Sequence, residues 1–275
     1  KRGMEFHAWL NPYRASSRVP IEEISKTHII HTHPEWTLKY GENTYLDPGI
    51  PEVRAYTNQV VHDIVSRYDV DAIHFDDYFY PYKINGELFP DNASFKRFGN
   101  SFYPDQLEDW RRCNVDQIIQ ELGATIKKAK PWVQFGISPF GVWRNADVDP
   151  TGSKTQASQT NYDDLYADIK GWVEKEWIDY VVPQAYWHIG FEIADYIEIT
   201  KWWNDNSANA HLYIGQSVSR LNTDRAPEWK SHPKTEIEKQ LDINKTLSKV
   251  KGSVFFNGST FQRNPLNIVE RLQQY

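Results

Sequence analysis

The chain has very little cysteine. Its 275 residues contain only Cys113, which excludes an intramolecular disulfide framework and a metal site built from a cluster of cysteines. Long apolar runs are also missing, since no stretch approaches the roughly 18 consecutive apolar residues that a transmembrane helix needs. The sequence therefore predicts no membrane span within this chain.

An excess of positive charge is absent too. Lysine and arginine number 31 against 37 aspartates and glutamates, which gives a formal net charge of −6. Proteins that bind nucleic acid neutralise phosphates with clustered basic side chains. Nucleic acid is therefore not expected as a partner.

Aromatic residues are plentiful. The 11 tryptophans, 16 tyrosines and 13 phenylalanines make up 15% of the chain. Large rings can fill a hydrophobic core, or they can form flat platforms on which sugars or bases stack. Composition alone leaves both interpretations open.

Short apolar, β-branched runs alternate with longer segments of helical periodicity. The expected strands are residues 4–10, 71–76, 133–139, 179–186, 212–218 and 253–256. Strands that alternate with helices predict a parallel sheet with helical crossovers, hence an α/β fold. No Ser/Gly/Pro-rich linker divides the chain, so we expect a single domain over residues 1–275.

A barrel is favoured over an open sheet. A doubly wound sheet usually has a glycine-rich phosphate turn after its first strand, and this chain has none. Polar and aromatic residues instead follow nearly every expected strand, as in (β/α)₈ TIM barrels, whose active sites lie at the strand ends. Six strand–helix units are visible, so the prediction is a TIM-type barrel. Because the chain opens inside an expected strand, N-terminal truncation is favoured over two unrecognised strands.

The run DAIHFDDYFYP at residues 71–81 contains the most chemically informative residues. Side chains alternate along a strand, so Ile73 and Phe75 share one face while His74 and Asp76 share the other. The apolar face would pack on helices and the polar face would point into the barrel. Asp76 would then lie at the inner end of the strand.

Asp77 follows directly, and it would reach the mouth only if the strand ends at or before it. Carboxylates at such a position can have charge states set by their surroundings. The structural alternatives are that both aspartates cap the next loop or pair with arginines. The arginines considered are Arg14, Arg111 and Arg112.

Paired carboxyl groups suit glycoside hydrolysis, in which one protonates the leaving oxygen and the other attacks or stabilises the cationic sugar. Adjacent side chains cannot easily flank a sugar from both sides, so a second carboxyl from elsewhere is expected. The sequence does not identify it. Loop candidates are Glu87, Asp91, Asp147, Glu192 and Glu228.

Several long motifs resemble those of the bacterial glycosyl hydrolase-like 10 family. They are EFHAWLNPYR (5–14), HFDDYFYP (74–81), DWRR (109–112), FGISPFGVWRN (135–145) and DYVVPQAYW (179–187). The resemblance implies a TIM-barrel hydrolase that acts on glycans, is secreted or periplasmic, and is linked to bacterial cell-wall strands. It also implies two βα units before Gly3, so we expect this chain to be truncated relative to the family.

The 71–81 strand also resembles the catalytic strand of family 18 chitinases, which ends in two alternating Asp residues and then Glu. Here the series is His74, Asp76 and Tyr78, so a mechanism with that Glu as acid cannot be carried over. What the resemblance leaves is Asp76 as nucleophile or electrostatic stabiliser. Asp77 would assist it, and His74 would orient it.

A second set of residues is predicted to bind substrate. Rings at or past strand ends could stack on sugars, and Arg, Asn and Gln side chains could orient hydroxyl, N-acetyl or carboxylate groups. This set is Asn11, Arg14, Tyr78, Tyr80, Trp143, Arg144, Gln184, Tyr186 and Trp187. Arg14 or Arg144 would meet a lactyl carboxylate, although a structural ion pair explains either equally well.

The sequence thus predicts a glycoside hydrolase that cleaves a bacterial glycan, with peptidoglycan sugar strands as first choice and no cofactor. One alternative is a non-catalytic glycan-binding module on the same scaffold. Another is a metal-dependent hydrolase. Its ligands would be drawn from His7, His31, His33 and His74. Because Pro34 directly follows His31 and His33 in an expected loop, no metal site is assigned.

Overall fold

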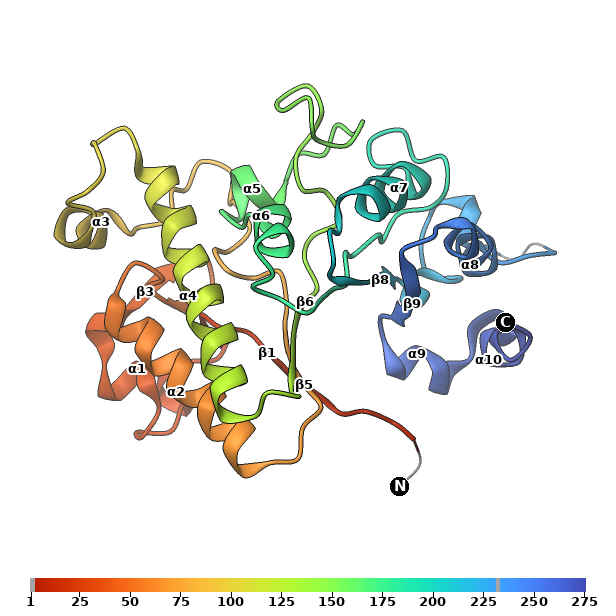
Figure 1. Cartoon of the computed structure of the whole chain (residues 1–275). Helices are drawn as coiled ribbons and strands as arrows, with labels where there is room; N and C mark the ends of the chain where they lie inside the picture. Colours follow the sequence, from red (N-terminus) through yellow and green to blue (C-terminus); the bar gives the residue numbers. More distant parts are fainter. Residues whose placement is uncertain (1–2, 231–232) are drawn as a thin grey trace. The chain divides into compact units, whose positions relative to one another are not determined.

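The computed structural model describes residues 3–230 and 233–275 (Figure 1). Their contacts group into two compact units. The first unit comprises residues 1–135 and 161–168, and the second comprises residues 136–160 and 169–275. The single domain expected from the sequence stays a prediction.

The first unit contains the start of the parallel sheet. Strands β1 (His7–Leu10) and β5 (Ala72–Phe75) pair in parallel, with Trp9 opposite His74. Strand β6 (Gln134–Ile137) begins here, and the Gln134 N–H donates to the Asp71 carbonyl at 2.9 Å. The Phe75 and Phe135 rings meet edge to face, with centroids 5.5 Å apart.

Two long helices lie side by side in this unit (Figure 1). Helix α2 (Pro51–Arg67) starts with proline at its first turn, where no intrahelical partner is needed for the missing N–H. Helix α4 (Leu107–Ala129) is the longer of the two. Each of these helices buries an apolar face. The buried residues include Val53, Val61 and Val65 of α2, and Val115, Ile118, Ile119, Leu122 and Ile126 of α4.

The first unit also holds a small antiparallel sheet that the sequence did not reveal. Its strands are β2 (Arg14–Ser17), β3 (Thr37–Tyr40) and β4 (Asn43–Leu46), in the order β2-β4-β3. Gly41 adopts a φ of 57° in the tight β3–β4 connection, which favours glycine. The short helices of the first unit are η1 (Ile21–Glu23), α1 (Ile29–Thr32), η2 (Pro34–Trp36), α3 (Asn92–Phe98) and α5 (Asn161–Asp164).

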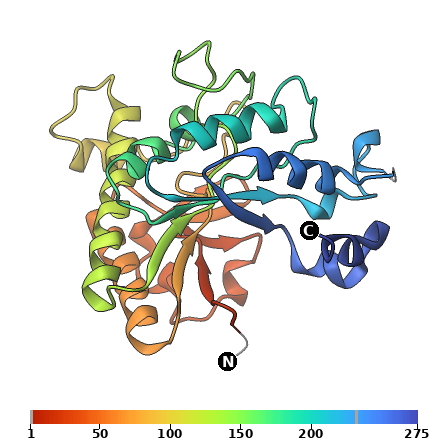
Figure 2. The same ribbon diagram turned by 45° about the vertical axis from the view of Figure 1, so that its right-hand side comes forward.

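The second unit continues the parallel sheet in the order β6-β7-β8-β9. Strand β7 is Tyr180–Val181, β8 is His211–Gln216 and β9 is Val250–Phe255. Figure 2 shows β8 and β9 running side by side. The helices are α6 (Ile169–Glu174), η3 (Val218–Arg220), η4 (Pro227–Trp229), α7 (Tyr196–Asn206), α8 (Glu236–Thr246), α9 (Gly258–Arg263), η5 (Pro265–Asn267) and α10 (Ile268–Leu272).

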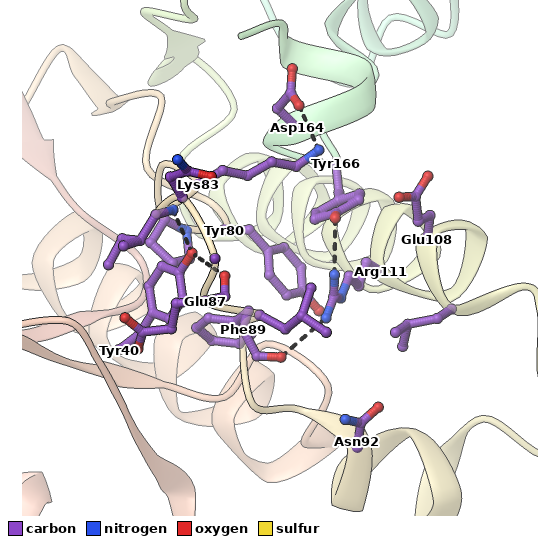
Figure 3. A pocket seen from close by; sticks show the side chains of 16 residues that line it. Tyr40, Tyr80, Lys83, Glu87, Phe89, Asn92, Glu108, Arg111, Asp164 and Tyr166 are labelled. Carbon is purple, nitrogen blue, oxygen red and sulfur yellow. Dashed lines mark hydrogen bonds and ion pairs between the residues drawn. The ribbon is translucent and has the colours of Figure 1, made fainter. Parts of the chain in front are cut away.

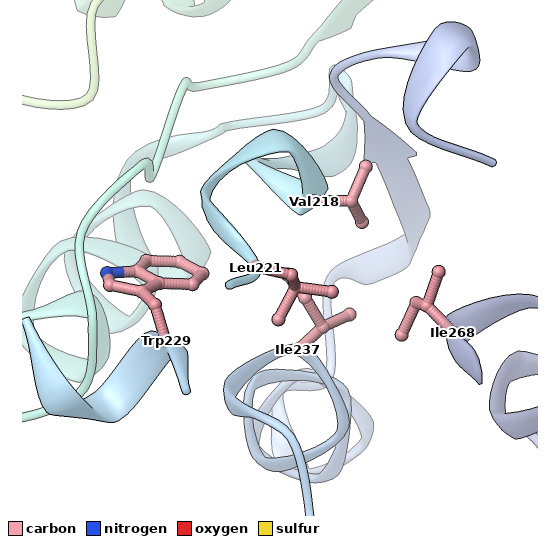
Figure 4. Close-up of a cluster of buried hydrophobic side chains, with 5 residues drawn as sticks. All are labelled: Val218, Leu221, Trp229, Ile237 and Ile268. Atoms are coloured by element: carbon pink, nitrogen blue, oxygen red, sulfur yellow. The ribbon is translucent and has the colours of Figure 1, made fainter. Parts of the chain in front are cut away.

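Close packing in the second unit fixes particular residues. Gly136 on β6 must lack a side chain, because a Cβ there would overlap the ring of Tyr180 on β7. Beyond β8, an apolar cluster fills the space between short helices (Figure 4). Its buried members are Val218, Leu221, Trp229, Ile237 and Ile268. Helix α8 starts from a capping box in which Thr235 and Glu238 satisfy each other's backbone N–H groups.

The described residues therefore contain six parallel strands with helical crossovers, and the predicted α/β class is confirmed. Four of the six expected runs contain one of these strands, and the runs 212–218 and 253–256 overlap β8 and β9 in part. Closure into a barrel stays a prediction. No helix in residues 3–230 and 233–275 combines the length and apolarity that crossing a membrane requires.

Ile118 on α4 offers a test of the first unit's core. Its side chain is fully buried, so Ile118→Ala removes apolar contacts and leaves a cavity. We expect the free energy of unfolding to fall by about 2–5 kcal/mol, measured by urea denaturation. Lys128→Ala on the exposed side of the same helix is the control, and an equal loss in both variants would contradict this placement.

Candidate carboxylate site at the end of strand β5

Two aspartates follow β5 immediately and are withdrawn from solvent. Asp76 is 8% exposed and Asp77 is 2% exposed. The Asp77 N–H donates to Asp76 Oδ1 at 2.9 Å, so the loop-capping role considered for Asp76 is present. Because β5 ends at Phe75, both aspartates belong to the turn that leaves the strand.

Asp77 is built to retain a proton. Burial and the negative charge of Asp76 raise its pKa to about 8, against the opposing effect of a hydrogen bond from Tyr82. The Tyr82 hydroxyl donates to Asp77 Oδ2 at 2.5 Å. Two neighbouring carboxyl groups in a site of low dielectric cannot both ionise without a large cost, so Asp77 is the protonated member at neutral pH.

His74 precedes this pair on β5 and is uncharged at neutral pH. Burial lowers its pKa to about 4, although the nearby Asp76 acts in the opposite direction. His7 on β1 contributes a smaller lowering effect. His74 can therefore position its neighbours as a neutral imidazole, but it does not supply a positive charge.

Aromatic and cationic side chains surround the loop after Asp77. The Arg14 guanidinium lies over the Tyr78 ring, 4.7 Å from its centroid. The Tyr78 and Tyr82 rings are 5.3 Å apart. Asn11 is half-buried, and its side-chain oxygen has no hydrogen-bond partner among the described residues. Tyr82 was not predicted from the sequence. The only sequence feature that points to it is its position five residues after Asp77.

Tyr80 does not present an open ring. It is 1% exposed, and its ring meets Phe89 and Tyr166 edge to face, with centroids 5.3 and 5.1 Å away. The first unit therefore uses this ring in packing. Its predicted contact with substrate stays a prediction.

The second unit holds the other predicted substrate-binding residues. Trp143 is 6% exposed and stacks on Trp202, with centroids 5.5 Å apart. Arg144 Nη1 lies 2.9 Å from Asp149 Oδ2, which is the ion pair considered as the alternative. The Gln184 side-chain amide donates to the Ser138 carbonyl at 2.9 Å.

Tyr186 and Trp187 are half-buried. The Tyr186 ring lies near Phe256, with centroids 5.9 Å apart and planes inclined by 30°. Trp187 meets Phe140 edge to face at 5.4 Å. These two rings are the predicted stacking residues of the second unit that remain accessible.

The structure thus groups the predicted residues within each unit. The first unit brings together His74, Asp76, Asp77, Tyr78 and Arg14. Asn11 and Tyr80 also belong to the first unit, and the second contains Trp143, Arg144, Gln184, Tyr186 and Trp187. Of the loop acids considered as a second carboxyl, Asp91 is fully buried in an ion pair with Arg111, with a shortest distance of 2.6 Å. The partner acid stays unassigned.

The histidines considered for a metal site have other partners. His31 Nε2 lies 3.2 Å from the carbonyls of Ile21 and Ile24, and His33 pairs with Glu35 at 3.0 Å. Among the residues with described positions, no group of three or more His, Cys, Asp or Glu side chains could hold a metal ion. The metal-dependent alternative gains no support from this arrangement.

The fold of this chain is similar to that of a solved glycoside hydrolase domain. The PgaB (BpsB) glycoside hydrolase domain from Bordetella bronchiseptica has a TM-score of 0.58 to this chain at 12% identity, covering 98% of this chain and 75% of that one. At this low identity the likeness concerns the fold alone. The fold is therefore of the type found in glycoside hydrolase domains.

The chain belongs to the glycosyl hydrolase-like 10 family, whose sequence pattern matches residues 1–231. The predicted family is thereby confirmed. The chain is 46% identical over 275 residues to glycosyl hydrolase YngK of Bacillus subtilis (strain 168), covering 99% of this chain and 53% of YngK. It is 39% identical over 270 residues to glycosyl hydrolase DigH of Escherichia coli (strain K12), covering 93% of this chain and 61% of DigH.

The chain accordingly spans about half of YngK and three fifths of DigH. Family membership shows that this chain is of the glycosyl hydrolase-like type.

The raised pKa of Asp77 has a measurable consequence for stability. Between its ordinary pKa of 3.8 and about 8, the unfolded chain releases this proton while the folded chain keeps it. The free energy of unfolding should therefore fall as pH rises through this window. Asp77→Asn should weaken that dependence, measured by urea denaturation at pH values from about 4 to about 9.

The lowered pKa of His74 acts in the opposite sense, because the folded state resists protonation and loses stability as pH falls from 6.5 towards about 4. A His74→Gln variant isolates this acid-side contribution. If wild type and Asp77→Asn show parallel pH profiles, the proton on Asp77 is not retained on folding.

Proposed function

We propose that this chain contributes the catalytic carboxylates of a glycoside hydrolase that cleaves glycosidic bonds in a bacterial glycan, with peptidoglycan sugar strands as the first choice. The observation that carries the proposal is the buried Asp76–Asp77 pair, in which burial and the charge of Asp76 together raise the pKa of Asp77. Such a division between two titratable groups is how hydrolases assign acid and charged roles.

Asp76 is the nucleophile or electrostatic stabiliser in this proposal. Its negative charge would stabilise the positive charge that develops on the sugar ring during bond cleavage. Asp77, protonated at neutral pH and hydrogen-bonded by Tyr82 at 2.5 Å, would assist Asp76, and the general acid would come from elsewhere. Neutral His74 would position the strand end, and no cofactor takes part.

Substrate would be gripped by the accessible polar and aromatic side chains. Arg14 and Tyr78 lie beside the carboxylates, where they could contact the flanking sugars. In the second unit, Tyr186 and Trp187 keep partly exposed rings that suit stacking on the apolar faces of sugars. The names of the relatives YngK and DigH support glycoside hydrolysis, and a glycan of the cell wall would place the protein in the cell envelope or outside the cell.

A non-catalytic glycan-binding module is the second candidate. It is favoured by the position of Tyr78, where the resembling chitinase strand has its acidic residue, and by the hydrogen bond from the Asp77 N–H to Asp76. Release of reducing ends separates the two functions. A binding module would retain glycan without generating new ends.

Asp76→Asn in the full-length protein tests the catalytic assignment. We expect the release of reducing ends from purified peptidoglycan strands to fall by at least about a thousandfold, or about 4 kcal/mol of transition-state stabilisation. Asp71→Asn provides the matched control, because Asp71 precedes the other end of β5 and accepts a hydrogen bond from the Phe6 N–H at 2.6 Å. Full turnover in Asp76→Asn, with unchanged folding by circular dichroism, would overturn the assignment.

A further inference from the structure

A pocket of about 610 Å³ lies within the first unit (Figure 3). Its walls come from the loop after β5, strand β3, the start of α4, and the segment at α5. The lining includes Tyr80, Lys83, Glu87, Glu108, Arg111 and Asp164. The volume falls within the range of small-molecule sites, about 300–1,000 Å³.

The pocket is continuous in sequence with the carboxylate site. Tyr80 and Pro81 contribute to its wall and follow Asp77 by three and four residues. The same loop therefore carries Tyr82, which donates to Asp77, and then turns into the pocket lining. A ligand in the pocket would contact the chain segment that leaves the proposed catalytic strand.

Arg111 is not available to bind an anion. Its Nε and Nη2 donate to the two carboxylate oxygens of Asp91 at 2.9 and 2.6 Å. Its Nη1 donates to the Tyr166 hydroxyl at 2.9 Å. Nη2 also reaches the Phe89 carbonyl at 3.3 Å. The positive charge is thus compensated, and most of the N–H donors are already used.

Lys83, the other cation of the lining, is also paired. Its Nζ lies 2.6 Å from Asp164 Oδ1, and it donates to the Asp163 carbonyl at 3.4 Å. Figure 3 shows this side chain extended towards Asp164. Neither cation of the pocket therefore presents an uncompensated positive charge to a ligand.

Carboxylate oxygens, in contrast, are left over. Among the residues that the structure describes, Glu108 makes no hydrogen bond or ion pair. Glu87 uses Oε1 to accept from the Gly41 N–H at 3.1 Å, and its Oε2 has no partner of this kind. The lining contains three carboxylates against two cations, so the pocket offers acceptors and carries excess negative charge.

We infer that this pocket binds a sugar unit that carries no acidic group, as an additional subsite for the glycan. The inference rests on the proposed function, because the carboxylate acceptors of the pocket could bind any ligand that is rich in hydrogen-bond donors. Sugar hydroxyls and amino groups can donate to Glu87 and Glu108. A uronate or lactyl carboxylate would face the negative charges of Glu87 and Glu108 without a free cation, and this like-charge repulsion would weaken its binding.

The test uses the full-length protein carrying Asp76→Asn, so that bound oligosaccharides are not consumed. Isothermal titration with the N-acetylglucosamine tetramer or the glucosamine tetramer should show binding, and the galacturonic acid tetramer should bind at least about tenfold more weakly. Addition of Glu108→Gln should weaken the tetramers without acid groups by about tenfold, as expected for a lost hydrogen bond to a charged group. Glu108→Lys should reduce or reverse the discrimination against the acidic tetramer.

Asp109→Asn is the matched control, because Asp109 lies on the same first turn of α4 and does not line the pocket. It should leave the three dissociation constants unchanged. Equal binding of acidic and non-acidic tetramers, or no effect of either Glu108 variant, would overturn the subsite. A wild-type protein that releases no reducing ends, while its Asp76→Asn form binds as described, would refute hydrolysis and leave the subsite standing.

Discussion

The electrostatic conflict between two consecutive carboxyl groups governs the end of β5. Asp76 and Asp77 are both withdrawn from water, where the repulsion between two negative charges is strong. The chain resolves this conflict by keeping a proton on Asp77 and by supplying donors. The Asp77 N–H donates a hydrogen bond to the Asp76 carboxylate, and the Tyr82 hydroxyl donates one to the Asp77 carboxyl group. The loop after the strand must therefore fold back far enough for Tyr82 to reach the carboxyl.

The small antiparallel sheet helps to hold this loop in position. The Tyr40 hydroxyl on β3 accepts from the Ile84 N–H at 2.7 Å and donates to the Glu87 carbonyl at 3.2 Å. From the other side, Arg111 on α4 holds the Phe89 carbonyl and the Asp91 carboxylate. The loop that carries Tyr82 is thus anchored near its end by two separate elements.

Periodicity was sufficient to predict the main elements of the fold. The buried stripes of α2 and α4 and the six parallel strands follow from the spacing of apolar residues, because burial on a repeating face is a local property of the sequence. The β2-β4-β3 sheet was missed. Its strands have four residues each, and RASS in β2 lacks the apolar alternation that marks a strand.

The candidate site was predictable in part. Position at a strand end located Asp76 and Asp77, and the adjacency of two acids suggested perturbed charge states. Ring exposure could not be predicted, because it depends on distant partners. Tyr80 packs on Phe89 and Tyr166, and Trp143 stacks on Trp202. An aromatic residue after a strand is therefore a weak indicator of a sugar platform unless its neighbours are known.

The compensation of charge around Arg111 shows why residue type alone misleads about ligand preference. An arginine in a pocket wall suggests an anion site, yet both terminal nitrogens and Nε of Arg111 have acceptors within the protein. Removing the charge of the buried Asp91 would leave an uncompensated guanidinium, which is far more costly than the pair itself. Asp91 thus fixes the loop and cancels the field of Arg111 at the same time. The selectivity of such a pocket is decided by the side chains left unpaired, here the carboxylates at its wall, rather than by the most strongly charged residue within it.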